Sequence, residues 1–210
     1  YLGYYPFTKF SYILIDNKSA LEQRFHFSKC RPKTGDKKLR KEEKADWNEN
    51  PKVLKNYSDK FFLIASELHE EKFSNKKSSN NSFIFETIAN IFQNPQSDFG
   101  SKHEGRDLII VSDMMQRSDR FSFYKACNAR SSEAKCPSLD DFMKGLSESD
   151  RDYLTASAPD GTNINLKMIY LNHRYETNKE IDKSLKDLWV EYFNSRNFKK
   201  VDVISQVDIP

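Results

Sequence analysis

Residues 106–113 read Arg-Asp-Leu-Ile-Ile-Val-Ser-Asp and constrain the fold more than any other segment of the chain. Four consecutive large aliphatic residues, from Leu108 to Val111, are typical of a central parallel strand that is buried on both faces. Strands of this kind belong to α/β proteins, in which helices cover the sheet. The segment ends in a carboxylate, Asp113. Because ligands of open α/β sheets bind beyond the carboxyl ends of the strands, Asp113 lies where a hard cation can be held.

Shorter apolar segments alternate with helical patterns along the rest of the chain. Strands are predicted at residues 9–16, 24–28, 165–171 and 201–204, where β-branched and aromatic residues cluster. Helices are predicted at residues 51–68, 82–92, 138–143 and 177–192 from their apolar spacing and capping residues. Residues 30–50 and 73–81 are predicted loops. This order predicts one α/β domain over residues 1–210, a three-layer, Rossmann-like and mostly parallel sheet flanked by helices on both faces.

The composition excludes several classes of protein. Sixteen Phe, ten Tyr and two Trp are enough for a real core, so wholesale disorder is not expected although 31% of residues are charged. No segment reaches the roughly 18 apolar residues of a transmembrane helix. The net charge of +3 comes from interleaved acidic and basic residues, which argues against a nucleic-acid partner.

Ser82, at the start of the predicted helix 82–92, is the second candidate site residue. Its hydroxyl either caps that helix or completes a metal shell together with Asp113. The glycine-rich phosphate loops and the Gly-x-Ser-x-Gly nucleophile motif are missing from the sequence. The four histidines fall in separate predicted elements without ligand-like spacing, so each is interpreted as a surface or strand residue.

Two segments resemble landmarks of the von Willebrand factor A domain. Asn81-Ser82-Phe-Ile-Phe-Glu-Thr87-Ile88 resembles the start of the helix before the family's fourth strand, and residues 107–116 resemble that strand with its terminal Asp. The resemblance implies a metal-ion-dependent adhesion site in which Ser82 and Asp113 hold Mg²⁺ or Mn²⁺. An open coordination position would take a carboxylate from a partner. The element Phe27-Ser28-Lys29-Cys30-Arg31-Pro32 is similar to one in bacterial exported members of the family.

The family's Asp-x-Ser-x-Ser motif, which ends its first strand, is not found in the sequence. We therefore interpret residues 9–16 as the second strand and residues 24–28 as the third, and we expect the first strand upstream of Tyr1. The alternative assigns the motif's Asp to Asp16, although the spacing of Asp16 and Ser19 differs from the motif. Under either assignment, residues 1–210 are expected to contain only part of the metal site, or a site that has lost its ion.

The resemblance implies a module for protein–protein interaction or scaffolding in a larger assembly, and not an enzyme. The alternative is a metal-dependent hydrolase or nucleotide-binding enzyme on a Rossmann-like sheet, with Asp113 as a metal ligand. That alternative needs a second catalytic group at a neighbouring strand end. Asn172, His173 and Arg174, after the predicted strand 165–171, are the candidates.

The three cysteines give information about the cellular compartment of the protein. Cys127 and Cys136 either close a small disulfide, if the surroundings are oxidising, or remain two free thiols. The similarity to exported proteins implies the periplasm or the cell surface, with the cytoplasm as the alternative. The aromatic cluster Phe121-Ser-Phe-Tyr124 is interpreted either as a loop packed on the sheet edge or as an exposed surface for a partner.

Overall fold

The computed structural model describes residues 8–13, 15, 27–36, 48–74, 81–94, 105–129, 131, 133–157, 160–171 and 179–205. Contacts group the chain into two compact units. The first comprises Tyr1–Leu14 and Glu22–Ser78, and the second comprises Ile15–Leu21 and Ser79–Pro210. Among the described helices, none has both the length and the apolarity needed to cross a membrane.

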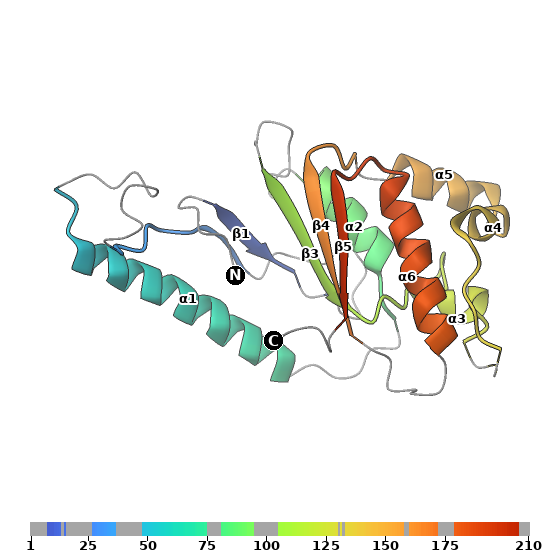
Figure 1. The fold of residues 1–210 in the computed structure, drawn as a ribbon, viewed down its shortest axis with the longest axis horizontal. Helices are drawn as coiled ribbons and strands as arrows, with labels where there is room; N and C mark the ends of the chain where they lie inside the picture. The colour runs from blue at the N-terminus through green and yellow to red at the C-terminus, as the bar shows by residue number, and fades with distance from the viewer. Residues whose placement is uncertain are drawn as a thin grey trace. The chain divides into compact units, whose positions relative to one another are not determined.

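The first unit contains a two-stranded sheet and one long helix (Figure 1). Strands β1 (Lys9–Tyr12) and β2 (Phe27–Cys30) are antiparallel. The prediction that a helix opens at Asn50-Pro51 is confirmed by α1 (Pro51–Ser74), since the Asn50 side chain accepts the N–H of Lys52 at 3.0 Å. Phe61 of α1 packs on Phe27, with ring centroids 5.3 Å apart.

The predicted apolar stripe of α1 is only partly correct. The buried face carries Ser58 and Phe61, whereas Val53, Tyr57 and Ile64 are 46%, 59% and 40% exposed. Two short strands offer a narrow surface, so α1 can bury one row of side chains and leaves the neighbouring row in solvent. Sequence periodicity identified the helix but could not identify which row its partner covers.

The second unit is an α/β structure built on a three-stranded parallel sheet of order β3-β4-β5 (Figure 1). Its strands are β3 (Arg106–Ser112), β4 (Ile164–Tyr170) and β5 (Lys200–Ser205). Its helices are α2 (Ile84–Gln93), α3 (Phe123–Ala126), α4 (Leu139–Lys144), α5 (Glu148–Ala156) and α6 (Lys179–Asn194). The α/β class is confirmed, and α3 and α5 are additions to the predicted elements.

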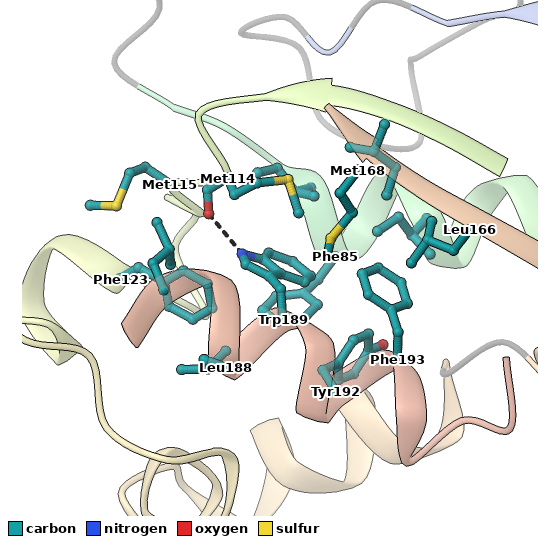
Figure 2. Packing of buried hydrophobic residues seen from close by; sticks show 14 of the residues in the cluster. Phe85, Met114, Met115, Phe123, Leu166, Met168, Leu188, Trp189, Tyr192 and Phe193 are labelled. Carbon is teal, nitrogen blue, oxygen red and sulfur yellow. Dashed lines mark hydrogen bonds between the residues drawn. The ribbon is translucent and has the colours of Figure 1, made fainter. Parts of the chain in front are cut away.

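The core of this unit lies between the sheet and helices α2 and α6. Phe85 of α2 and Trp189 of α6 have ring centroids 4.4 Å apart, so both helices pack on the same face of the sheet. Figure 2 shows these two rings with Phe123 and, from β4, Leu166 and Met168. Burying this many aromatic side chains in one cluster supplies the main hydrophobic stabilisation of the unit.

The prediction that residues 106–113 form a central strand buried on both faces is wrong for the described sheet. β3 lies at the sheet edge, next to β4 alone. Leu108 and Ile110 are buried against the helices, whereas Ile109 and Val111 on the other face are 46% and 54% exposed. The described helices of this unit therefore cover one face of the sheet. The run of aliphatic residues alone did not distinguish an edge strand from a central strand.

Candidate functional site

Asp113 follows β3 directly, at the carboxyl end of the sheet. One of its carboxylate oxygens, Oδ1, accepts the N–H of Met115 at 3.1 Å, and the Ser112 hydroxyl oxygen accepts the N–H of Met114 at 3.0 Å. Met114 has a positive φ of 58°, and its carbonyl accepts the indole N–H of Trp189 at 2.9 Å (Figure 2). These bonds turn the chain sharply after the strand and fix the orientation of the Asp113 side chain.

Ser82 lies on a segment that pairs with the loop after Asp113. Its N–H donates to the carbonyl of Arg117 at 2.8 Å, and the N–H of Arg117 donates back to the carbonyl of Ser82 at 2.9 Å. Arg117 is four residues beyond Asp113. The segments of both predicted metal ligands are therefore adjacent in the fold, joined by a backbone bridge.

The interpretation of Ser82 as the helix cap is wrong. α2 begins at Ile84, and its N-cap position is Phe83, which makes no side-chain cap bond. The capping role falls to Gln116, whose side-chain oxygen accepts the N–H of Phe85 at 3.0 Å. A cap supplied by a residue 31 positions away has no local signature, so sequence spacing could not reveal it.

Gln116 also connects α2 to the Asp113 loop through its amide nitrogen. This nitrogen donates to a Glu86 carboxylate oxygen at 3.0 Å and to the Ser118 hydroxyl at 3.2 Å. Gln116 is 0% exposed and Glu86 is 9% exposed, so both side chains are buried. Buried polar groups that are fully bonded in this way hold two segments in one arrangement.

Two residues that sequence reasoning missed lie at the same end of the sheet. Tyr170 ends β4 and is in register with Ser112, and its phenol donates to a carboxylate oxygen of Asp182 on α6 at 2.6 Å. Burial, followed by the hydrogen bond to Asp182 and the charges of Asp182 and Asp113, raises the pKa of Tyr170 well above its usual value. Parallel register alone would have placed the end of the predicted strand 165–171 beside Asp113.

The donor types near Asp113 suit a hard cation, because carboxylate and hydroxyl oxygens are the ligands that Mg²⁺ prefers. The described residues do not complete such a site, since no group of three or more His, Cys, Asp or Glu among them is arranged to hold a metal ion. Ser82 and Asp113 would thus supply part of a coordination shell, with further ligands from water, from a partner or from residues outside the described set.

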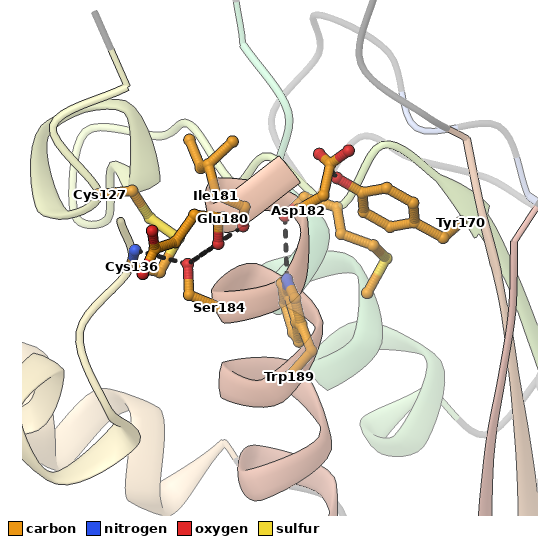
Figure 3. The surroundings of a disulfide bond; sticks show 9 residues. Cys127, Cys136, Tyr170, Glu180, Ile181, Asp182, Ser184 and Trp189 are labelled. Carbon is orange, nitrogen blue, oxygen red and sulfur yellow. Dashed lines mark hydrogen bonds between the residues drawn. A yellow bond between two sulfur atoms is a disulfide. The ribbon is translucent and has the colours of Figure 1, made fainter. Parts of the chain in front are cut away.

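The Cys127–Cys136 disulfide fixes the loop before α4. Of the two alternatives for these cysteines the structure contains the disulfide, with both residues buried. The Cys136 N–H donates to the Ser184 hydroxyl of α6 at 2.9 Å (Figure 3). The Leu139 N–H donates to the Glu191 carboxylate of the same helix at 2.8 Å. The end of the loop is therefore attached to α6 at two points.

The aromatic cluster after Asp113 packs inward. Phe121 and Phe123 are 1% and 0% exposed, and Tyr124 is 37% exposed. Packing of this loop is thus the correct alternative for the two phenylalanines. Asp16 and the group Asn172, His173 and Arg174 lie outside the described residues, as do His26, His103 and the side chain of His69.

Comparison of the chain with protein-family models, curated proteins and solved structures gives no match.

Proposed function

We propose that this chain is a protein–protein interaction or scaffold module of von Willebrand A type, and not an enzyme, that works within a larger assembly. One observation carries the proposal: the bridge between Ser82 and Arg117 brings the two sequence segments that resemble the family's metal site into contact. The two segments are far apart in the sequence, and no interaction between neighbouring residues would bring them together. Their adjacency at the carboxyl end of a parallel strand is the arrangement that the resemblance requires.

Ser82 and Asp113 are the proposed ligands of Mg²⁺ or Mn²⁺, directly or through water. The ion would supply an electrostatic bridge to an acidic group of the partner. The chain's own contribution is orientation: the Met115 N–H holds one oxygen of Asp113, and Gln116 anchors the following loop on α2. Groups fixed by hydrogen bonds before binding lose less entropy on binding.

The proposed location is the periplasm or the cell surface. A disulfide between two buried cysteines supports it, because such bonds persist in oxidising compartments and are rare in the cytosol. Cys30, by contrast, is exposed and free.

The proposal is tested by capturing partners on the immobilised protein in Mg²⁺ and in EDTA, with extract from the organism that makes it. A partner should be retained in Mg²⁺, released by EDTA, and not retained by Asp113→Ala. Asp107→Ala is the matched control, since Asp107 lies near the start of the same strand, bonded to Asn165 at 2.8 Å. A partner that is held equally in EDTA and by the Asp113 variant would refute metal-bridged binding.

A further inference from the structure

Helix α1 carries a second apolar row that no described part of the first unit covers. Val53, Tyr57 and Ile64 follow one another at steps of four and seven residues, so they lie on one face of the helix. Their exposed fractions are 46%, 59% and 40%. Phe61, in the neighbouring buried row, packs on Phe27 of β2. An exposed apolar row beside a buried one is typical of a helix that also binds a second partner.

The charges of α1 are segregated by sign along its length. The half that begins at Pro51 has one acidic residue, Asp59, and three basic residues, Lys52, Lys55 and Lys60. The half that ends at Ser74 has one basic residue, Lys72, and three acidic residues, Glu67, Glu70 and Glu71. A helix dipole favours acidic residues near the start of a helix, yet the first turn of α1 contains none. The charge order therefore opposes the dipole of α1 itself.

A second α1 that runs in the opposite direction has the complementary order of charges. In an antiparallel pair the basic half of each helix lies beside the acidic half of the other, and the two dipoles oppose one another favourably. In a parallel pair, halves of like charge would meet. The charge order of α1 thus favours both one occupant of the exposed row, a second copy of the chain, and one direction for it.

We infer that two copies of this chain associate through antiparallel pairing of their α1 helices along the exposed row. Setting Val53 of one copy opposite Ile64 of the other also sets Tyr57 opposite Lys60, because each is four residues further along its own helix, in opposite directions. Lys60 is exposed, and its ammonium group is attracted to the face of an aromatic ring. Two-fold symmetry repeats each of these contacts.

The residues that decide the direction of pairing flank the apolar row. Lys52, Leu63 and Glu67 are exposed and lie on one side of the row, at steps of eleven and four residues. In an antiparallel pair this side of one helix meets the same side of the other. Lys52 then lies two residues, about 3 Å along the axis, from the position opposite Glu67 of the second copy. Each end of the pair therefore contains one contact between Lys52 and Glu67.

Sedimentation equilibrium of the full-length protein tests the pairing. The measurement is made in EDTA and in a Cys30→Ala background, which excludes dimers joined through the exposed thiol. The contact is confined to one helix, so we expect a weak and reversible dimer, and the measurement extends to about 500 μM protein. Circular dichroism of every variant checks that α1 is retained.

Exchange of charges identifies the helix and its direction. Lys52→Glu or Glu67→Lys alone should weaken the dimer about tenfold, because two attractive contacts become repulsive. An equimolar mixture of the two variants should recover the original affinity, since both contacts of the mixed dimer again join opposite charges. Lys55→Glu is the matched control. It makes the same change in net charge at an exposed position about 200° round the helix from Val53, and it should alter the affinity little.

Three results would each overturn the inference. A monomer at every concentration would show that another part of the chain or a different protein covers the exposed row. A dimer that neither charge variant weakens would be formed through another surface. A mixture that associates no better than the single variants would exclude antiparallel pairing. No metal ion or other partner is present in these measurements, so failure here is distinguishable from failure of the proposed function.

Discussion

At the scale of single residues, Gln116 holds the candidate site together. Its side chain caps α2 through the Phe85 N–H and donates to the Glu86 carboxylate, and it is fully buried. Both partners are buried as well, so water cannot replace the bonds if Gln116 is removed. The Ser82 and Asp113 segments flank this residue and depend on it for their positions.

Replacing Gln116 by Met keeps the side-chain length and removes all three side-chain hydrogen bonds. We expect Gln116→Met to lower the free energy of unfolding by about 2–4 kcal/mol, because two buried polar groups lose their partners. Urea unfolding followed by Trp189 fluorescence in a Trp47→Phe background measures this. Gln93→Met, at an exposed position of α2, is the matched control and should change little. Equal stability of the two variants would contradict the structural role of Gln116.

Two buried tyrosines predict how stability depends on pH. Burial raises the pKa of Tyr192 to about 12, and burial with Asp182 raises that of Tyr170 further. In the unfolded chain both ionise near pH 10. The two neutral tyrosines therefore contribute fully to the stability of the folded state below about pH 10. As pH rises toward the folded-state pKa values, the free energy of unfolding falls by about 1.4 kcal/mol per pH unit for each tyrosine.

Urea unfolding of the second unit between pH 9 and 11.5 tests this expectation. Tyr192→Phe should reduce the slope of stability against pH by about half within that window, because one of two ionising groups is gone. Tyr124→Phe, at an exposed position, should leave the slope unchanged. A slope that Tyr192→Phe does not alter would show that this phenol ionises equally in both states.

At the scale of elements, features that depend on neighbouring residues could be predicted from the sequence, whereas features that depend on distant residues could not. The start of α1 at Asn50-Pro51 and the Ser138 cap of α4 follow from neighbouring residues, and both are present. The short helices α3 and α5 have little apolar periodicity to reveal them. The place of β3 in the sheet, the capping by Gln116 and the bond from Tyr170 to Asp182 depend on partners distant in sequence, which a local pattern does not encode.

The disulfide loop gives a prediction at this scale. Cys127 and Cys136 are nine residues apart, and closing so short a loop stabilises the folded state by about 2–3 kcal/mol. Cys136→Ala should lower the unfolding free energy of the second unit by that amount, and reductant should do the same to the unaltered protein. Cys30→Ala is the control, because Cys30 is exposed and free. Insensitivity to reductant, with both thiols labelled by alkylation in the native protein, would show that the bond does not form.

At the scale of the whole molecule, the proposed site lies at one end of the described parallel sheet. The parallel strands β3 and β4 end together, so Asp113 and Tyr170 meet there, and Asp182 joins them from α6. The α/β class was predictable from the alternation of strands and helices. The metal site at this end of the sheet stays a proposal, because the sequence lacks the Asp-x-Ser-x-Ser motif that would specify its remaining ligands.

The most direct measurement is the binding of Mn²⁺ to the natural full-length protein, followed by electron paramagnetic resonance of the free ion. We expect one saturable Mn²⁺ site, for which Mg²⁺ competes. Asp113→Ala should abolish it, Ser82→Ala should weaken it, and Asp107→Ala should leave it intact. Absence of saturable binding, or a site that survives Asp113→Ala, would contradict the proposal that Ser82 and Asp113 hold a cation.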